Sequence, residues 1–328
     1  MDTRRKAVIL EAAAVSPGDL SWEPVTDLCD TVIYDNTTET QKWDRIGDAE
    51  IVLTNKVIID EKVFEKFPGI HYVGVCATGY NVVDLEAAAR RGIPVTNVPA
   101  YSTDSVAQHT FALLLDLASK VSMHDASVKA GDWSRVETFC YWKAPIIEIY
   151  GKTLGIYGFG NIGRTVAKIA KSFGLRILVH TEHPEKYQEY ADAQLQFTDE
   201  ESLFRQSDFI TLHCPQTERT TKLIRRENIE KMKRGVILLN LARGGLVDEQ
   251  DLIEALESGK IGGAGLDVIE SEPMRADHPL LQAPNLLITP HIAWATLEAR
   301  ARLIDTVGAN LRAWMNGTPQ NVVNRHFL

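Results

Sequence analysis

The sequence predicts an α/β protein built from two doubly wound parallel sheets. Short β-branched apolar runs alternate with longer stretches of helical periodicity from end to end, which is typical of parallel strands joined by crossover helices. A glycine-rich turn stands directly after one of these runs. The 328 residues also provide enough chain for two hydrophobic cores.

The first series of strands is expected within residues 1–100. Apolar runs occupy residues 7–10, 31–34, 51–54, 71–75 and 94–97, and residues 84–91 between them have a helical pattern. These elements suffice for one small doubly wound sheet with a flavodoxin-like arrangement.

The second series begins in the middle of the chain. Its runs cover residues 153–157, 176–180, 209–213, 236–240, 261–268 and 286–289. Six parallel strands of this kind make a complete second sheet.

Two long helices are expected beside these series. Residues 102–121 carry apolar side chains at helical spacing with small and apolar residues around them, so this helix should be buried nearly all round. Residues 295–315 place Ala299, Leu303, Val307 and Leu311 on one stripe. Because this last helix follows the second series, we expect it to return to the first domain, which then comprises residues 1–100 and 296–328, with 101–295 inserted.

Composition excludes several classes of protein. Lys and Arg number 35 against 44 Asp and Glu, and the net charge of −9 disfavours nucleic acid or an anionic membrane as partner. No apolar run approaches the ~18 residues of a membrane-spanning helix. The four cysteines are too scattered for a disulfide framework or a metal knuckle, so we expect reduced thiols and a cytoplasmic location.

The clearest motif is Gly158, Gly160 and Gly163 in the pattern GxGxxG, between the expected strand 153–157 and a helical stretch at 162–173. The first glycine permits a tight turn, the second lets a pyrophosphate approach the backbone, and the third lets the helix pack on the strand. The helix N-terminus then attracts the phosphates. This pattern predicts a Rossmann-type dinucleotide site, and the bland alternative is a glycine-rich turn without a ligand.

An acidic residue is expected about 20 positions later to bind the adenosine ribose. Thr181 and Glu182 stand there, and the nearest downstream cation is Lys186. We therefore favour NAD and leave NADP open, since Thr181 occupies the usual acidic position. Glu182 as a solvated loop carboxylate is the alternative.

Three polar residues follow expected strands of the second series: Arg243, Glu272 and His291. Parallel topology brings all three to the carboxyl edge of one sheet, where ligands bind. An arginine can grip a carboxylate and polarise a ketone, a histidine can transfer the alcohol proton, and a carboxylate can orient that histidine. Taken singly, Arg243 could form a loop salt bridge, Glu272 could lie in a surface turn, and His291 could be a half-buried ring with satisfied hydrogen bonds.

The remaining histidines and cysteines favour no other chemistry. His213 ends a strand before Cys214 and Pro215 and could line a nicotinamide, whereas His109 lies within the expected buried helix. No cluster has metal-ligand spacing, and we expect no metal.

At this point the chain resembles the D-isomer-specific 2-hydroxyacid dehydrogenases. The segments GYNVVDLEAAARRGIPVTNVP, GKTLGIYGFGNIG, ILLNLARGGLVDEQDLIEAL, GLDVIESEP and TPHIAWAT occur in the family's order. STDSVAQHT and FCYWKAPIIEIYGKTLGI look most like the glycerate dehydrogenases, also called hydroxypyruvate reductases.

The resemblance implies a role for each candidate residue. Arg243 would bind the substrate carboxylate and carbonyl, His291 would be the acid/base, and Glu272 would pair with it. The substrate site would include Ala77, Thr78 and Gly79, which offer backbone N–H groups, together with Arg243, Trp142 and Trp294. The cofactor site would comprise Val106, Thr110, Gly158, Phe159, Gly160, Asn161, Ile162, Gly163, Thr181, Glu182, His213, Cys214, Pro215, Thr220, Leu241, Ala242, Arg243, Asp267, His291 and Ala293.

The resemblance also implies the activity and the assembly. We expect an NAD(H)-dependent D-2-hydroxyacid dehydrogenase with residues 101–295 as the NAD-binding domain and residues 1–100 and 296–328 as the substrate domain. Hydroxypyruvate or glyoxylate reduction is favoured, and D-lactate-type or branched-chain activity stays open. An NADH-sensing protein of corepressor type is the alternative from another class, and formate dehydrogenase is disfavoured by Glu272. We expect a homodimer formed through the cofactor domain.

Overall fold

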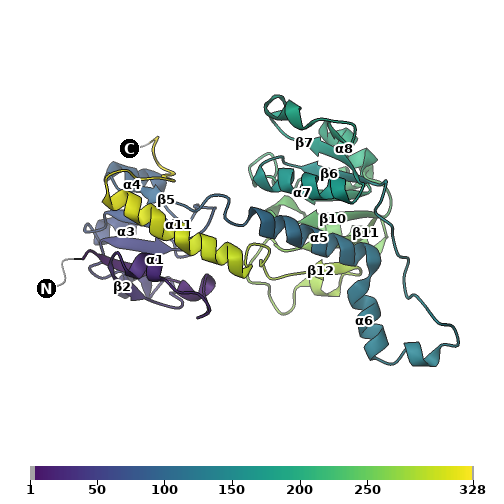
Figure 1. Cartoon of the computed structure of the whole chain (residues 1–328), viewed down its shortest axis with the longest axis horizontal. Coiled ribbons are helices and arrows are strands. Elements are labelled where there is room, and N and C mark those ends of the chain that lie inside the picture. The colour runs from purple at the N-terminus through teal and green to yellow at the C-terminus, as the bar shows by residue number, and fades with distance from the viewer. Residues whose placement is uncertain (1–3, 327–328) are drawn as a thin grey trace. The chain divides into compact units, whose positions relative to one another are not determined.

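The computed structural model describes residues 4–326, and contacts along the chain divide them into two compact units. Unit 1 comprises the residues up to Ser102 together with those from Ala295 on, and unit 2 runs from Thr103 to Trp294. Each is an α/β unit with one fully parallel sheet, so the predicted fold class is confirmed (Figure 1).

Unit 1 contains a five-stranded sheet in the order β2-β1-β3-β4-β5. Its strands and helices are β1 (Lys6–Ile9), η1 (Ala12–Ala14), α1 (Glu23–Thr26), β2 (Asp30–Ile33), α2 (Lys42–Arg45), β3 (Ile51–Thr54), α3 (Glu61–Lys66), β4 (Tyr72–Val75), α4 (Leu85–Arg90), β5 (Val95–Thr96) and α11 (Leu297–Met315). The order reverses between β1 and β3, which marks the topological switch point where such sheets bind ligands.

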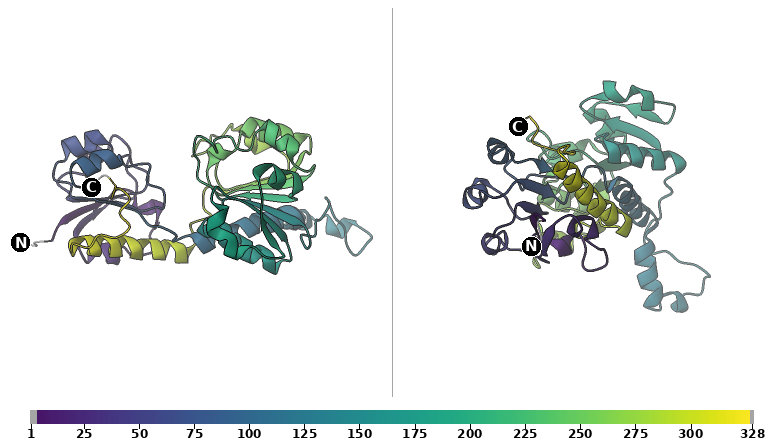
Figure 2. Two further views of the ribbon diagram at one scale, coloured as in Figure 1. Left: turned by 90° about the horizontal axis from the view of Figure 1, so that it is seen from above. Right: turned by 60° about the vertical axis from the view of Figure 1, so that its left-hand side comes forward.

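The sheet of unit 1 is covered on both faces (Figure 2). On one face Val8, Val52 and Val73 pack against α3 and α4. On the other, α11 packs against α1 and β4, and the four residues of its predicted stripe are all buried. The apolar stripe of α11 is therefore buried within unit 1.

Unit 2 contains a seven-stranded sheet in the order β12-β11-β10-β9-β6-β7-β8. Its elements are α5 (Thr103–Ser119), α6 (Val121–Lys129), η2 (Trp133–Arg135), β6 (Thr153–Tyr157), α7 (Asn161–Ser172), β7 (Arg176–His180), η3 (Pro184–Tyr190), β8 (Leu195–Phe197), α8 (Glu200–Gln206), β9 (Phe209–Leu212), α9 (Arg226–Lys231), β10 (Val236–Asn240), η4 (Gly244–Leu246), α10 (Glu249–Glu257), β11 (Ile261–Leu266), η5 (Pro279–Gln282) and β12 (Leu286–Ile288). The switch point of this sheet lies between β6 and β9.

The two faces of this sheet bury alternate side chains of each strand. In β10, Ile237 and Leu239 pack with α5 and α7, whereas Val236 and Leu238 pack with the opposite helices. A strand buried on both faces reads as an unbroken apolar run, which is why the sequence pattern located these strands.

Three sequence predictions about unit 2 were wrong. The sheet has a seventh strand, β8, which escaped notice because it is a three-residue edge strand with only one buried side chain. The helix predicted over 102–121 ends at Ser119, since Lys120 adopts a left-handed conformation with φ 56°, and α6 begins after it. Gln108 and Ala112 of α5 are exposed, so this helix is not buried all round.

Candidate active site

The three glycines after β6 meet three different physical requirements. Gly158 has φ 98°, and a Cβ there would lie 2.6 Å from the backbone of His213. A Cβ on Gly163 would lie 2.2 Å from the carbonyl oxygen of Gly158, so helix α7 packs directly on the turn. A Cβ on Gly160 would meet nothing within 4 Å. Packing demands the first and third glycines, whereas the second leaves its backbone open to an approaching ligand.

The N-terminus of α7 is suited to bind phosphate. Asn161 is its first residue, and within the described residues the N–H groups of Asn161, Ile162 and Gly163 donate to no protein acceptor. The helix dipole adds positive potential at this end. Phe159 contributes only its backbone here, because its ring packs edge-on against Tyr187, Tyr190 and Phe197.

The end of β7 presents an ion pair that the sequence did not reveal. Thr181 is half-buried there, and the Glu182 carboxylate lies 3.5 Å from the Arg219 guanidinium. Arg219 lies 37 positions further along the chain, in the segment after β9, so no local pattern indicates it. Both side chains are 63% exposed, and Glu182 follows the strand end near which an adenosine ribose is expected.

Arg243 stands at the carboxyl end of β10 on a braced turn. The buried Asn240 donates through Nδ2 to the Arg243 carbonyl (2.8 Å) and accepts from the Ala242 N–H (3.1 Å). The next residue, Gly244, lies so close to Ile269 that a Cβ would approach its carbonyl group to 1.9 Å. The arginine turn therefore packs directly on the segment that leads to Glu272.

His291 and Glu272 form the predicted pair. The Nδ1 atom of His291 lies 2.7 Å from a Glu272 carboxylate oxygen, whose other oxygen accepts the Ile269 N–H at 3.2 Å. Both side chains are about one-third exposed. Because a carboxylate only accepts hydrogen bonds, Nδ1 carries a proton, and Nε2 is left to exchange one with a ligand.

Asp267 holds the backbone that carries His291. It is 2% exposed, and its two oxygens accept hydrogen bonds from Thr289 Oγ1 (2.6 Å), the Ile292 N–H (2.9 Å) and the Ala293 N–H (2.9 Å). Its carbonyl accepts the N–H of His291 (2.8 Å), a residue with φ 55°. His109 on α5 completes the network, with Nε2 3.0 Å from Thr289 Oγ1.

His213 ends β9 beside the glycine turn. Its Nε2 lies 2.9 Å from Thr211 Oγ1, and its buried Nδ1 has no partner among the described residues. Burial lowers the pKa of His213 to about 3 and raises that of the adjacent Cys214 thiol to about 12. A neutral imidazole with an unsatisfied nitrogen next to Gly158 fits a dinucleotide ligand at this turn.

The other predicted cofactor residues lie around these elements. Val106 and Thr110 are buried on α5, and the Thr110 hydroxyl donates to the Val106 carbonyl (2.8 Å). Thr220 donates to the Pro215 carbonyl (2.8 Å) in the segment after β9. Leu241 and Ala293 are buried beside the turns that carry Arg243 and His291.

The predicted substrate residues are distributed over both units. Trp294 donates its Nε1–H to the His291 carbonyl at 2.8 Å. Trp142 is 69% exposed on segment 121–150, and no contact links it to Arg243, Glu272 or His291 within the described residues. Helix α5 begins near the carboxyl edge of the sheet, where Ser105 bonds Ala293, and ends near the amino edge, where Leu117 packs at the start of β11. The segment that carries Trp142 therefore begins at the edge opposite to the three polar residues. The loop of Ala77, Thr78 and Gly79 follows β4 in unit 1.

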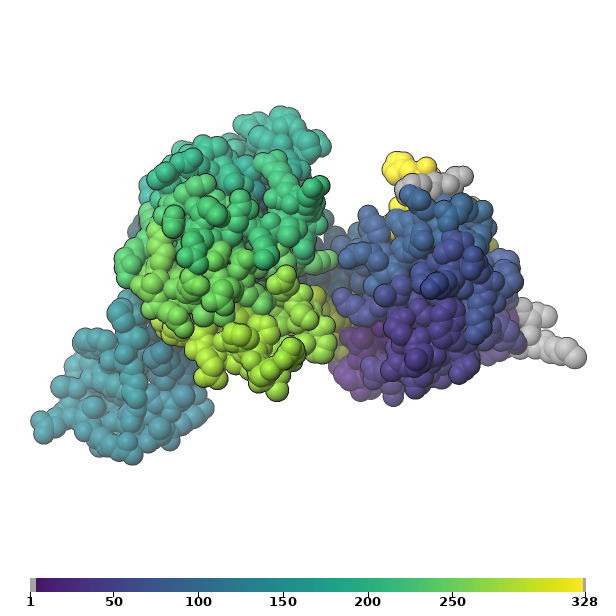
Figure 3. Space-filling view, turned by 180° about the vertical axis from the view of Figure 1, so that it is seen from behind, coloured from purple at the N-terminus to yellow at the C-terminus, as the bar shows by residue number. Residues whose placement is uncertain are grey.

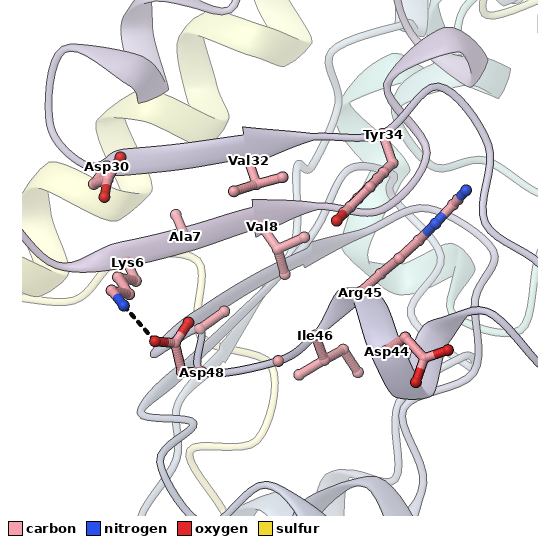
Figure 4. Close-up of a pocket in the computed structure, with 12 residues that line it drawn as sticks. Lys6, Ala7, Val8, Asp30, Val32, Tyr34, Asp44, Arg45, Ile46 and Asp48 are labelled. Atoms are coloured by element: carbon pink, nitrogen blue, oxygen red, sulfur yellow. Dashed lines mark hydrogen bonds and ion pairs between the residues drawn. The ribbon is translucent and has the colours of Figure 1, made fainter.

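A surface hollow in unit 1 is a separate feature. Its lining includes Lys6, Asp30, Asp48 and Val32, and Lys6 forms an ion pair with Asp48 (Figure 4). These residues lie mostly at the amino ends of β1, β2 and β3, the edge opposite to the one where ligands bind in such sheets. In residues 4–326 no helix is long and apolar enough to cross a membrane, and no group of three or more His, Cys, Asp or Glu side chains could hold a metal.

The chain matches known sequences over nearly its whole length. Residues 111–293 match the family model for the NAD-binding domain of D-isomer specific 2-hydroxyacid dehydrogenases. A hydroxypyruvate reductase of Blautia hydrogenotrophica is 45% identical and is covered completely by 98% of this chain. A glycerate dehydrogenase of Methylorubrum extorquens is 41% identical, with 88% of this chain and 90% of that protein covered.

Solved structures show the same fold. A Thermus thermophilus protein superposes with a TM-score of 0.85 at 33% identity, covering 97% of this chain and 99% of that one. An NADPH-dependent glyoxylate/hydroxypyruvate reductase of Sinorhizobium meliloti, in complex with NADP and malonate, has a TM-score of 0.82 at 27% identity, covering 98% and 97% of the two chains. A nicotinamide dinucleotide therefore fits the fold of this protein.

Proposed function

Because the chain belongs to the D-isomer specific 2-hydroxyacid dehydrogenase family, we propose that it reduces hydroxypyruvate or glyoxylate to D-glycerate or glycolate with NADH. The family assignment establishes an oxidoreductase acting on small 2-hydroxy acids. The individual 2-oxo acid and the choice of NADH are the proposed part.

The observation that carries this proposal is the His291–Glu272 pair beside the Arg243 turn. The three residues follow β12, β11 and β10, which are neighbours in the sheet. One N–H of the Arg243 guanidinium donates to the Ala242 carbonyl (2.7 Å), and its remaining N–H groups can bind a carboxylate and an adjacent ketone oxygen. The residue that would bind the carboxylate and the residue that would transfer the proton therefore lie at the same edge of the sheet.

The chain's own residues divide the reaction between them. Bound reduced nicotinamide would supply the hydride that adds to C2 of the 2-oxo acid. Arg243 polarises the C2 carbonyl, and the Nε2–H of protonated His291 donates its proton to the resulting alkoxide oxygen. Glu272, bonded to Nδ1, keeps the imidazole oriented and stabilises its positive charge.

The cofactor would lie along the turn after β6. Gly160 would leave room for the pyrophosphate, the N-terminus of α7 would face the phosphates, and His213 and Ala293 would line the nicotinamide end. We propose NADH over NADPH because Glu182 favours ribose hydroxyls and repels a 2′-phosphate. Arg219 works in the opposite direction, so its ion pair with Glu182 sets the balance.

Unit 1 is proposed as the substrate domain. Its loop of Ala77, Thr78 and Gly79 would offer backbone N–H groups to the substrate carboxylate. Trp294 and Trp142 are proposed to shape the pocket, the former through its bond to the His291 carbonyl. The four free cysteines fit a reducing compartment, and we propose the cytosol.

We further propose a homodimer formed through unit 2. Segment 121–150 protrudes from this unit (Figure 3), and it exposes large apolar side chains, with Phe139 at 88%, Trp142 at 69%, Ile146 at 59% and Trp133 at 51%. Such a concentration of exposed aromatic area marks an interaction surface. Light scattering on the wild type and on Phe139→Ser/Ile146→Ser tests this proposal. A monomeric wild type would contradict it.

The activity is tested by steady-state oxidation of NADH and NADPH with hydroxypyruvate, glyoxylate, pyruvate and a branched 2-oxo acid. We expect the highest kcat/KM for hydroxypyruvate or glyoxylate with NADH. His291→Ala should lower kcat by at least about 10²-fold and weaken NADH binding far less, since its main loss is the proton donor. Equal rates with NADPH would overturn the cofactor preference, and normal turnover in His291→Ala would overturn the assigned acid/base.

A further inference from the structure

The loop that follows β4 is held through three consecutive carbonyl groups. The Cys76 carbonyl accepts from Asn55 Nδ2 (2.8 Å), the Ala77 carbonyl from the Val98 N–H (3.0 Å), and the Thr78 carbonyl from Asn97 Nδ2 (2.7 Å). Three consecutive acceptors are thus bound from the body of unit 1. These three bonds restrict the backbone conformation of a loop that is otherwise partly exposed.

The N–H groups of the same loop are left without partners. Among the described residues, no hydrogen bond starts from the N–H of Ala77, Thr78 or Gly79. Backbone N–H groups that have no acceptor in the protein are available to bind an anion. The carbonyl bonds therefore decide which groups this loop presents.

The first support comes from the switch point of the sheet. Glu11, after β1, accepts hydrogen bonds from the N–H groups of Asn55 (2.8 Å), Lys56 (2.9 Å) and Val57 (3.0 Å) and from Thr54 Oγ1 (3.1 Å). The carboxylate thus fills the anion site that the turn after β3 would otherwise offer. It also fixes the turn from which the Asn55 amide reaches Cys76.

The second support is a chain of asparagines that begins beyond α11. Asn321 Nδ2 donates to Asn310 Oδ1 (2.8 Å), Asn310 Nδ2 donates to the Asn97 carbonyl (2.9 Å), and the Asn97 N–H donates to the Asn321 carbonyl (3.2 Å). Asn97 and Asn310 are buried. Since Thr78 presents a carbonyl, which only accepts, the amide nitrogen of Asn97 must face it.

We propose that Asn55 and Asn97 are positioning residues that hold the loop N–H groups of Ala77, Thr78 and Gly79 in place for the carboxylate of the substrate. This inference rests on the proposed function for the identity of that anion. Neither asparagine touches the substrate, because each side chain reaches only the carbonyl side of the loop. Their contribution is to remove the cost of ordering the loop when the carboxylate binds.

The test uses Asn55→Ala and Asn97→Ala in the full-length protein. We expect each variant to raise KM for the preferred 2-oxo acid, and Ki for oxamate, about tenfold, with kcat and KM for NADH within about twofold of wild type. Hydrogen exchange in the peptide covering residues 72–83 should become faster. Oxamate should slow that exchange in the wild type and have little effect in the variants.

Asn324→Ala is the matched control in the same unit. The Asn324 side chain is also buried, accepts a hydrogen bond from the Val95 N–H (3.0 Å) and donates one to the Ile93 carbonyl (2.9 Å). No hydrogen bond joins it to the loop among the described residues. We expect it to lower thermal stability without changing KM for the 2-oxo acid. A purely structural role for Asn55 and Asn97 predicts the same pattern in all three variants.

The outcomes separate this inference from the proposed function. If the wild type turns over a 2-oxo acid but both variants keep its KM and the loop exchange rate, the positioning role is refuted and the function stands. If the wild type turns over no 2-oxo acid, the proposed function fails. Oxamate protection of the wild-type loop that disappears in Asn97→Ala would then still support the positioning role, and absence of protection in the wild type would refute it.

Discussion

Replacing Asp267 with Asn separates two roles for this carboxylate. The resemblance assigns Asp267 to the cofactor site, whereas in the structure both oxygens are engaged by Thr289, Ile292 and Ala293. If the second description is complete, Asp267→Asn perturbs the loop that carries His291 and leaves cofactor binding alone.

The size of the effect follows from the bonds lost. The carboxamide oxygen of the variant can still accept from Thr289 and Ile292. Its amide nitrogen, however, is a donor and would face the N–H of Ala293, another donor, in a residue that is only 3% exposed. Losing a charge-assisted hydrogen bond and burying an unpaired N–H together cost about 2–4 kcal/mol of unfolding free energy. A displaced His291 should also lower kcat by about 10–10²-fold.

Urea unfolding, steady-state kinetics and NADH titration by fluorescence measure the three quantities. Asp208→Asn is the control, since Asp208 also accepts a backbone N–H, from Thr153 (2.9 Å), but at the amino edge of the same sheet. It should lose stability without losing kcat. A weaker affinity for NADH in Asp267→Asn, with unchanged stability, would refute the loop-holding role and favour direct contact with the cofactor.

Three further predictions concern the cofactor site. Gly163→Ala should cost about 1–3 kcal/mol of stability and weaken NADH binding, because its Cβ would overlap a carbonyl 2.2 Å away, whereas Gly160→Ala, with nothing within 4 Å, should weaken NADH binding alone; urea unfolding and NADH titration check both. Burial lowers the pKa of His213 to about 3, so the native state stays unprotonated at pH values where the unfolded chain, with the ordinary histidine pKa, binds a proton. The free energy of unfolding therefore falls as the pH drops. Between about pH 7.5 and 5.5, His213→Gln should lose about 1.4 kcal/mol less than wild type in urea unfolding, and equal losses would contradict the burial. Glu182→Gln releases Arg219 from its ion pair and should raise kcat/KM for NADPH relative to NADH about tenfold; an unchanged ratio would show that the pair does not set cofactor choice.

Local sequence patterns located most elements because parallel strands buried on both faces are continuous apolar runs. Those at 51–54, 153–157, 176–180 and 236–240 match the observed strands residue for residue. Strand β8 and the end of α5 were missed, because neither a three-residue edge strand nor a left-handed lysine leaves a periodic signal. Similarly, strand ends alone indicated Arg243, Glu272 and His291, since topology places such positions at one edge.

The amino-acid sequence is sufficient to predict the fold class, the glycine-rich turn after β6 and the polar groups at the sheet edge. It could do so because each depends on residue types within a short segment or on the order of strands along the chain. How those groups are held depends on contacts that form only in the folded chain. Glu182 forms an ion pair with Arg219, and Asp267 accepts the N–H of the residue after His291. The Asn97 carbonyl accepts a hydrogen bond from Asn310, 213 positions away. Such hydrogen bonds join residues that are close in space and distant in sequence, so no local pattern encodes them.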